Sequence, residues 1–598
     1  MVRNIGSFYA EATPIEGLRL RGTFSFDQFS NTQQRYYDQR RGVFEANQGV
    51  PYSGEGNTYR RRINENINIV KEFLIGYNKA FGDHSIDLIL NAMDQKVQWN
   101  NTQFGIDQNS PLPDWDQRRI DEGWAREDKG LLFERSPSGL QGYMGRLSYN
   151  YNSKYYLDAT VRRDGTSKFG HGYKWGTFPS FGAAWRISSE NFANQSFIND
   201  LKLRIGWGKT GNQETRDFAY LSLVNFNPVY ALGSGGSAIG DGLIQSAAAL
   251  GDFPIVDMSW ETVTTSNIGI DALMFNNRLS LTMEYYRRYT DGILQTINIP
   301  QVIGALSQPV VNLANVDNRG FELQGSFENN LGPFNYSIGA NLTTVRNRVS
   351  NLYQGRPSGG NYDRIEEGRS MNFLRGYITD GIFQTEEEVA NWLEANDDPG
   401  YEAQKSPGDI RFVDIQGPPE ASDGENAFFS PNPDGRVDAF DQTFIGKTIP
   451  GYYYGINLGL KYNNFDFTID FRGMGDVQRI FTNGLQSVGA GGGNFLVDYL
   501  DRWTPTNPSN TIPRAITDDP SGNNRIADRH VTDAGFFRFQ NFQLGYNVSG
   551  NLLSRLGVSN LRVYMMGQNL LVFSPFPGLD PENDTTPTTY IMGVNLGF

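Results

Sequence analysis

A short run of oxygen-bearing side chains between residues 430 and 441 comes closest to the spacing of a chemical site. Aligned with a twelve-residue calcium loop, it places Gly435 at the sharp turn and oxygen donors at positions 3, 5, 7, 9 and 12. These donors are Asn432, Asp434, the backbone carbonyl of Arg436, Asp438 and Asp441. The run therefore predicts a site for Ca2+ or a similar hard cation. A solvated acidic turn is the alternative, because position 12 is Asp rather than Glu and position 1 falls on Ser430.

Tryptophan is the second residue type with a chemical use. Aromatic faces stack on sugar rings while carboxylates and amides bind hydroxyls, so a glycan-sized ligand is chemically reasonable where both occur together. Segments that we expect to be long polar loops carry Trp99 and five candidate substrate-binding residues, which are Trp115, Trp124, Trp260, Trp392 and Trp503. We favour carbohydrate over peptide as the ligand, although a peptide would suit the same surface. For each single tryptophan, packing inside a loop is an equally good alternative.

No catalytic arrangement accompanies these residues. The chain has no cysteine and only three histidines, His84, His171 and His530, which lack the spacing of metal ligands. A Gly-x-Ser-x-Gly nucleophile motif is absent as well. A net charge of -14 argues against nucleic acid, because phosphate binding needs a basic face. We therefore expect no enzyme activity, no catalytic residue and no nucleic-acid partner, with Ca2+ as the only suggested cofactor.

The segments that position these residues are predicted to be β-strands. Mean hydropathy is -0.49, and no apolar run approaches the length of a membrane-spanning helix. At 454–472, apolar residues alternate with polar ones on both sides of Asn463-Asn464. Asn tolerates the positive φ that a two-residue hairpin turn needs. Similar hairpins are expected around 150–153, 276–277 and 329–330.

Two features favour a membrane barrel over a soluble sandwich. Aromatic residues such as Trp185, Tyr454, Tyr462 and Tyr590 stand near the ends of the apolar rows, which suits girdles at the two membrane interfaces. Tight Asn turns also alternate with long polar segments, at about 94–139, 227–261, 345–450 and 474–535. Short turns on one side and long loops on the other are typical of outer-membrane barrels. We therefore predict an all-β protein, a transmembrane antiparallel β-barrel with long extracellular loops in outer-membrane lipid.

The C-terminal strand supports the same location. Five residues fall on one face of this strand: Tyr590, Met592, Val594, Leu596 and Phe598. A terminal strand that ends in an aromatic residue is the signal by which barrel-assembly machinery recognises outer-membrane proteins. At the other end, residues 1–22 lack a charged region followed by an apolar stretch, so no signal peptide is visible. We expect the chain to be an N-terminally truncated barrel spanning 1–598.

Several sequence blocks resemble the SusC/RagA-type, TonB-linked outer-membrane transporters of Bacteroidetes-like bacteria, from about residue 140 to the end. They include YYLDATVRRDGTSKFG (155–170), LKLRIGWGKTGNQ (201–213), NVDNRGFELQGSF (315–327), GDIRFVDIQG (408–417) and DGRVDAFDQTFIGKTIPGYYYG (434–455). The family's version of the acidic loop directly follows a GDI…D block. The resemblance thus implies Asp414 as a further ligand of the predicted cation, across an insertion in the long extracellular loop 345–450.

The resemblance also implies a function. Members of the family have a plug domain inside a barrel of about 22 strands, whereas we count sixteen to eighteen strands here and see neither a plug nor a TonB-contacting segment. We expect the barrel portion of a TonB-dependent importer of oligomeric nutrients, with oligosaccharides as the favoured substrate. Its expected partners are a SusD-like surface lipoprotein and, through the plug region, the TonB complex. A passive pore or a surface-binding structural barrel without energised transport is the alternative.

Overall fold

The computed structural model describes residues 1–37, 57–108, 129–193, 197–221, 224–225, 229–231, 244–246, 249–250, 254–297, 308–355, 357–401, 404–420, 428–482, 497–516, 519–548, 550, 558–582 and 585–597. Within these ranges, 18 strands belong to one large sheet and the other strands form five two-stranded pairs. None of the helices in these ranges is both long and apolar enough to span a bilayer. The all-β prediction is confirmed.

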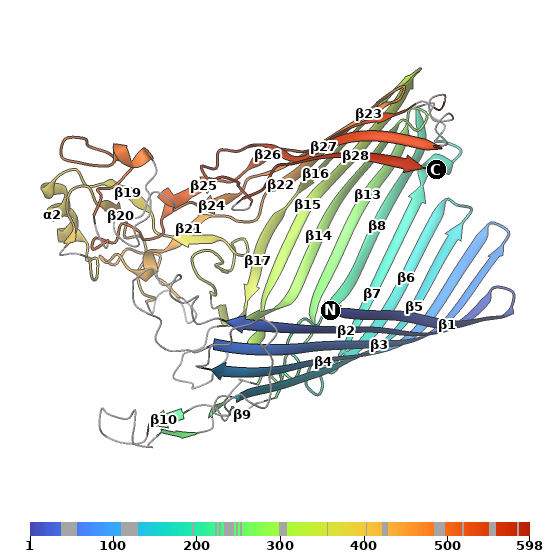
Figure 1. Ribbon diagram of the computed structural model, residues 1–598, viewed down its shortest axis with the longest axis horizontal. Helices are drawn as coiled ribbons and strands as arrows, with labels where there is room; N and C mark the ends of the chain where they lie inside the picture. The colour runs from blue at the N-terminus through green and yellow to red at the C-terminus, as the bar shows by residue number, and fades with distance from the viewer. Residues whose placement is uncertain are drawn as a thin grey trace. The chain divides into compact units, whose positions relative to one another are not determined.

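The chain divides into two compact units, which we describe separately. Unit 1 comprises residues 1–182, 208–261 and 294–311. Its strands β1 to β6 lie side by side, each antiparallel to the next (Figure 1). Their bounds are β1 (Val2–Ile15), β2 (Leu18–Tyr37), β3 (Asn57–Phe81), β4 (His84–Gln108), β5 (Lys129–Tyr151) and β6 (Tyr155–Thr166). Most of β7 (Trp175–Arg186) follows, with four short strands, β9 (Val224–Asn225), β10 (Val229–Ala231), β11 (Ile244–Ser246) and β12 (Ala249–Leu250).

Unit 2 comprises residues 183–207, 262–293 and 312–598. In this unit β16, β22, β23, β26, β27 and β28 pair in that order, all antiparallel (Figure 1). Its sheet strands are most of β8 (Ile198–Asn212), β13 (Glu261–Met274), β14 (Leu279–Thr296) and β15 (Val310–Leu331), then β16 (Phe334–Thr344), β17 (Arg346–Leu352), β22 (Tyr452–Tyr462), β23 (Phe465–Gly475), β26 (Phe536–Asn547), β27 (Asn560–Phe573) and β28 (Thr589–Gly597).

Positive backbone φ angles occur at the tight turns that the Asn residues predicted. Asn276 and Asn277 have φ of 59° and 62° between β13 and β14, and Asn463 has φ of 51° between β22 and β23. The turn placed at Asn329-Asn330 was wrong by about two residues, because both belong to β15 and the turn is made by Gly332 with φ of 62°. Glycine reaches positive φ at less steric cost than asparagine does.

Several long loops are shorter than the sequence indicated. The segment 94–139 was expected to be a loop, but β4 continues to Gln108 and β5 begins at Lys129, so Trp99 lies in a strand opposite Ser136. Likewise, β17 occupies the first residues of the expected loop 345–450. Ladder hydrogen bonds satisfy the backbone whatever the side chains are, whereas apolar alternation is required only where one face meets lipid. Strand pairing can therefore continue where the sequence pattern fades.

The two faces of the sheet differ as the alternation predicts. In unit 2, one cross-strand row near the tight turns is aromatic, and it consists of Phe334, Tyr462, Phe465 and Tyr546. The opposite face carries ion pairs, such as Arg562 to Asp466 at 2.6 Å and Arg204 to Asp271 at 2.6 Å. An aromatic row at the strand ends is the girdle expected at a membrane interface.

Candidate functional site

The residues that could recognise a ligand gather in a loop module, which we define as residues 353–451 and 476–535 of unit 2. It connects β17 to β22 and β23 to β26. Two backbone hydrogen bonds join its halves, since Tyr377 N donates to Ile526 O and Asp528 N donates to Tyr377 O, both at 2.9 Å. Its elements are α2 (Glu386–Ala395), β18 (Leu374–Gly376), β19 (Thr379–Ile382), β20 (Ile410–Phe412), β21 (Thr443–Gly446), β24 (Gln478–Ile480) and β25 (Val531–Asp533).

Helix α2 places Trp392 against the interior of the module. The Thr385 side chain accepts from Glu388 N at 3.2 Å, and the Glu388 carboxylate accepts from Gln384 N at 2.7 Å, so both partners stabilise the first turn. Trp392 Nε1 donates to Phe412 O at 3.2 Å, and its ring meets Phe383 edge-on. Helix α2 therefore presents Trp392 to the interior of the module.

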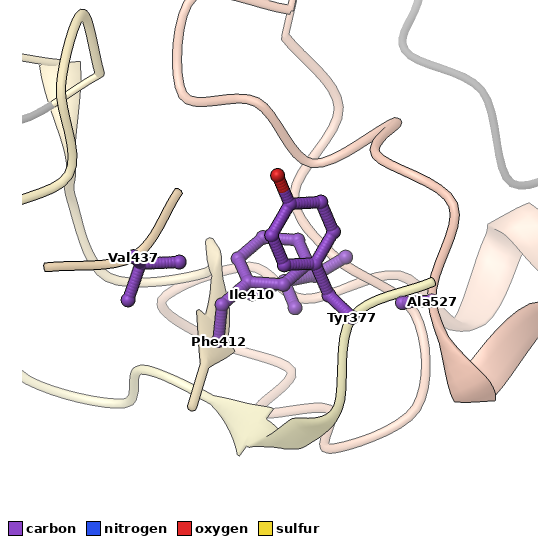
Figure 2. Close-up of a cluster of buried hydrophobic side chains, with 5 residues drawn as sticks. All are labelled: Tyr377, Ile410, Phe412, Val437 and Ala527. Atoms are coloured by element: carbon purple, nitrogen blue, oxygen red, sulfur yellow. The ribbon is translucent and has the colours of Figure 1, made fainter. Parts of the chain in front are cut away.

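The module has its own hydrophobic core (Figure 2). Tyr377, Ile410, Phe412, Val437 and Ala527 form this cluster, and Trp392 packs against it. The cluster draws residues from both halves of the module, so that the two long connections share one buried interior. Such sharing favours a folded unit over two independent loops.

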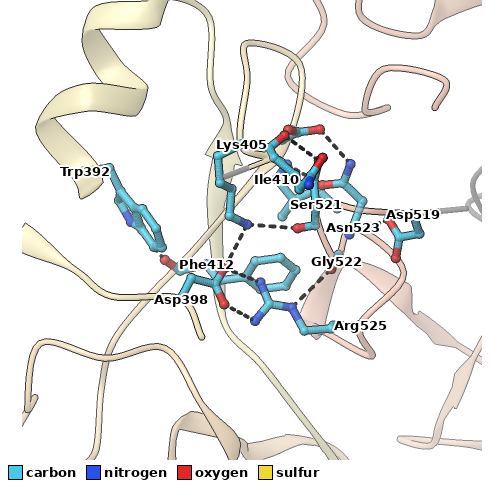
Figure 3. A network of polar contacts seen from close by, with 12 residues as sticks. Trp392, Asp398, Lys405, Ile410, Phe412, Asp519, Ser521, Gly522, Asn523 and Arg525 are labelled. Carbon is cyan, nitrogen blue, oxygen red and sulfur yellow. Dashed lines mark hydrogen bonds and ion pairs between the residues drawn. The ribbon is translucent and has the colours of Figure 1, made fainter. Parts of the chain in front are cut away.

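A buried charge network lies beside this core (Figure 3). The carboxylate of Asp398 pairs with Lys405 Nζ at 2.9 Å and with both terminal nitrogens of Arg525 at 2.9 and 2.8 Å. The side chains of Asp398 and Lys405 are 1% and 0% exposed. Burial lowers the pKa of Lys405, and the Asp398 carboxylate opposes that shift. The Arg525 guanidinium also stacks 3.9 Å from the ring centre of Phe412.

A second set of polar contacts extends this network. Asp409, which is 0% exposed, accepts from Arg514 at 2.7 and 2.9 Å and from Asn523 Nδ2 at 2.9 Å. The Asn523 carbonyl oxygen in turn accepts from Ile410 N at 2.8 Å, and Lys405 Nζ donates to Ser521 O at 3.0 Å. Because the buried carboxylates have matched donors, the network can fix the relative position of the two halves.

A cavity of about 800 Å3 opens next to Arg514. Its lining combines the Trp503 ring with three prolines and with the hydroxyls of Thr385, Ser406 and Thr504. Trp503 Nε1 donates to Gln384 Oε1 at 3.0 Å, which fixes the indole in place. Gly408, with φ of 93°, lies directly under this ring, and a Cβ there would be 2.4 Å from Trp503 Cε3. An oriented aromatic surface beside hydroxyls, Glu386 and Arg514 can bind a polar ligand that has apolar faces.

The other candidate tryptophans have different surroundings. Trp260 belongs to unit 1, where its ring meets Phe169 and Phe178 edge-on and its Nε1 donates to Lys174 O at 3.1 Å. These contacts join it to a small loop core around Phe169 and Met258. The packing alternative therefore describes the contacts of Trp260 and Trp392 better than ligand binding does. Trp115 and Trp124 lie outside the described residues.

The structure brings most residues of the predicted calcium loop together. Asp414 accepts from Gly435 N at 2.6 Å and from Asp434 N at 3.3 Å, across the insertion between them. The buried Asp441 carboxylate accepts from the backbone of Ile415, Gln416 and Asp438. Its burial raises the pKa to about 6, although the three N–H donors oppose this shift.

The remaining loop residues contact the turn itself. Asp438 accepts from Phe440 N at 2.8 Å, Asp434 accepts from Arg436 N at 3.0 Å, and Asn432 is exposed. In the described part of the chain, no group of three or more His, Asp or Glu side chains is arranged to hold a metal ion. The carboxylates thus bond mainly to backbone amides of the turn.

The terminal strand β28 has the expected alternation. Tyr590, Met592, Val594 and Leu596 are all exposed on the face opposite Gly593 and Asn595. Their cross-strand partners on β27 are, in the same order, Gly567, Met565, Val563 and Leu561. Phe598 lies outside the described residues. Recognition of this strand by the assembly machinery stays a prediction.

Sequence reasoning missed the residues that hold the module together. Asp398, Lys405, Asp409, Arg514 and Arg525 are charged residues in loop segments, where solvent exposure is the ordinary expectation. They follow no period, and of the five only Asp409 lies in one of the recognised sequence blocks, GDIRFVDIQG (408–417). Only the short polar stretches around them could have attracted notice, and these do not reveal which charges pair.

Comparison with known proteins agrees with the fold. A family described as TonB dependent receptor-like, beta-barrel matches residues 6–561. The TonB-dependent receptor P3 of Formosa agariphila is 29% identical over 99% of this chain and 58% of its own length. The TonB-dependent receptor SusC of Bacteroides thetaiotaomicron is 28% identical over 92% of this chain and 51% of its own length.

Among solved structures, the RagAB peptide transporter has a TM-score of 0.78 at 20% identity, covering 100% of this chain and 62% of that chain. The chain spans between half and three fifths of the curated relatives it matches. The family match covers almost all of the sequence and agrees with the antiparallel sheet and its alternating faces. The chain therefore belongs to the TonB-dependent receptor-like β-barrel family, whose members reside in the bacterial outer membrane.

Proposed function

We propose that the protein is the barrel portion of a TonB-dependent importer of oligosaccharides that works with a SusD-like surface lipoprotein. Membership of the receptor family supports the importer class. Similarity to SusC and to RagAB, which is titled as a peptide transporter, supports a lipoprotein partner. The observation that carries the substrate class is the cavity lined by Trp503, three hydroxyls, Glu386 and Arg514.

The cavity suits a sugar chain for a chemical reason. A pyranose ring presents C–H groups on its faces, which stack on an indole, and hydroxyls at its edge, which need donors and acceptors. Trp503 supplies the ring, and Gln384, Thr385 and Arg514 supply polar groups beside it. A peptide is the second candidate, because the similar RagAB structures are titled as a peptide transporter and a peptide importer.

We expect Trp503→Ala to weaken binding of the imported oligosaccharide about tenfold, which is about 1.4 kcal/mol, because it removes the aromatic surface on which a sugar ring would stack. Isothermal titration of the purified protein with a panel of oligosaccharides and oligopeptides measures the effect. Trp185→Ala is the matched control. Trp185 lies at the C-terminal end of β7, its Nε1 donates to Glu190 at 3.2 Å, and it lines no part of this cavity. Equal affinities of Trp503→Ala and the parent for the oligosaccharide would contradict the proposed site. Binding of oligopeptides but of no oligosaccharide would show that the substrate is a peptide instead.

Energised transport and the partner need a separate test. We expect uptake of the oligosaccharide to stop when TonB is removed and a lipoprotein to copurify with the protein. Uptake that continues without TonB would favour the alternative, a passive pore or a structural barrel. We also propose that the protein is not an enzyme, and cleavage of the oligosaccharide by the purified protein without a partner would refute this.

Calcium binding by the acidic loop is kept as a further proposal. Asp414 and Asp434 already lie at one turn, which supports it. We expect Asp434→Ala and Asp438→Ala each to weaken Ca2+ binding at least tenfold, since each removes one oxygen ligand of a hard cation. Asp397→Ala, an exposed carboxylate beside Arg436, serves as the control. Equal Ca2+ affinity in the parent and both loop variants would show that the carboxylates only brace the turn.

A further inference from the structure

A groove of about 480 Å3 crosses β3, β4, β5 and β6 on one face of unit 1. The cross-strand register explains its shape. One row aligns Phe73, Ala92, Tyr143 and Arg163, and the next aligns Ile75, Leu90, Gly145 and Val161. Ala92 and Gly145 are small, so the bulkier side chains around them leave a hollow between the strands.

This groove lies on the lipid-facing side. Phe73, Leu90, Tyr143 and Val161 are 51%, 47%, 55% and 54% exposed. The next residues along the strands alternate to the other face, where Arg146 pairs with Asp158. In an outer-membrane barrel the face with exposed large apolar residues contacts acyl chains, and the polar face lines the lumen.

Aromatic and cationic groups border the groove at its long-loop end. Tyr143 stacks on Trp175 with ring centres 6.2 Å apart, and the exposed Arg163 guanidinium lies 5.5 Å from the centre of the same Trp175 ring. Trp175 rests on Gly165, where a Cβ would be 2.8 Å from the indole. Tyr and Trp gather at the level of lipid headgroups, so Arg163 stands where a headgroup begins.

Further cations follow in the neighbouring rows on the same face. Lys71 is one row beyond Phe73, and Lys96 is one row beyond Asp94; both lysines are exposed. We call these rows, from the row of Phe73 and Arg163 to the row of Lys96, the cationic strip. Its carboxylate is Asp94, which lies opposite Lys71 and accepts from Gln141 at 3.3 Å. Three cations thus surround one carboxylate on a chain whose net charge is -14. Arg163 and Lys71 are three strands apart, about 14 Å, which exceeds the width of a single phosphate.

We propose that this strip binds a phosphorylated lipid of the outer leaflet, with an acyl chain in the groove and a headgroup of more than one phosphate against Arg163, Lys71 and Lys96. The orientation follows from the connections. Residues 152–154 form the tight turn before β6, whereas Arg163 lies near the end of β6 that leads into a longer connection. Tight turns of outer-membrane barrels face the periplasm. Arginine recognises phosphate through paired, charge-assisted hydrogen bonds.

Binding of diphosphoryl lipid A to the delipidated protein in detergent, measured by native mass spectrometry, tests the proposal. We expect Arg163→Gln to weaken binding about tenfold, because a charge-assisted hydrogen bond contributes enough for that change. Gly145→Leu should weaken it as well by filling the groove. A Cβ at Gly145 meets only Leu90 Cδ2, at 3.5 Å, so the fold can accept a side chain there. Lys79→Gln, an exposed cation at the turn end of β3, is the matched control and should bind as the parent does.

Two further measurements make the outcome decisive. Each variant is first checked for the heat-dependent gel mobility of a folded barrel. Lipid A without its phosphates should bind more weakly than diphosphoryl lipid A, and millimolar inorganic phosphate should not displace the lipid. Equal binding by the parent and Arg163→Gln, equal binding of the two lipids, or displacement by phosphate alone would each overturn the proposal.

Discussion

Replacing Asp398 by Ala is expected to destabilise the loop module by about 3–5 kcal/mol, because it removes one partner of a buried ion pair. The carboxylate neutralises two cations, Lys405, whose side chain is 0% exposed, and Arg525, whose side chain is 12% exposed. Lys405 is already disfavoured in its charged form, since burial lowers its pKa. Without the carboxylate, nothing offsets the free-energy cost of burying the Lys405 charge.

Hydrogen exchange at the amides of Tyr377 and Asp528 measures the effect. Each of the two residues bridges the halves of the module through its backbone. Loss of the network should therefore lower the free energy of opening at these two amides by the same amount that the module is destabilised. Asp397→Ala is the matched control, because this neighbouring carboxylate is 54% exposed and lies 3.4 Å from Arg436. An exposed pair contributes only about 0–1 kcal/mol. The same protection in both variants would show that Asp398 does not hold the halves together.

Replacing Ile338 by Arg is expected to destabilise the barrel by about 2–4 kcal/mol, the cost of a cation on the lipid face near the bilayer midplane. Ile338 is 46% exposed and lies in a cross-strand row with Leu458, Ile469 and Phe542. This apolar row is two rows from the aromatic row at the strand ends, so an arginine there cannot easily reach the interface. Urea unfolding of the protein from lipid vesicles measures the change.

The neighbouring position supplies the control. Ser337 points to the other face and lines a cavity of about 620 Å3 that also contains Asp466 and Glu328. Ser337→Arg should therefore change the unfolding free energy by less than about 1 kcal/mol, because its guanidinium has water and carboxylates nearby. If both arginines destabilise the protein equally, the assignment of lipid and lumen faces is wrong.

Much of the sheet could be predicted because lipid imposes a simple rule on each membrane-spanning strand. Alternate side chains must be apolar, and the turns must accept positive φ, so 454–472 and Asn276-Asn277 were placed correctly. The prediction failed where lipid does not act. Residues 94–108 continue β4 although their side chains do not alternate clearly, and the turn after β15 is made by Gly332 rather than by Asn329-Asn330.

The candidate site was predictable only in part. Trp503 was identified from its residue type, and the structure places it in a cavity with hydroxyl neighbours. Trp260 and Trp392 were identified for the same reason, yet their rings pack into small cores. Residue type alone cannot separate these cases, because an indole beside polar residues is equally compatible with a ligand surface and with the interior of a loop.

The sequence by itself determined the alternating strands, the tight turns and the apolar terminal strand, because these follow from local geometry and from contact with lipid. Only the tertiary structure decided that two connections, separated along the chain by the hairpin of β22 and β23, form one module, in which Arg525 reaches back 127 residues to Asp398. Charge pairs of this kind have no period along the chain. Their partners are selected by the positions of the strands that carry the loops, and by the high cost of burying either charge alone.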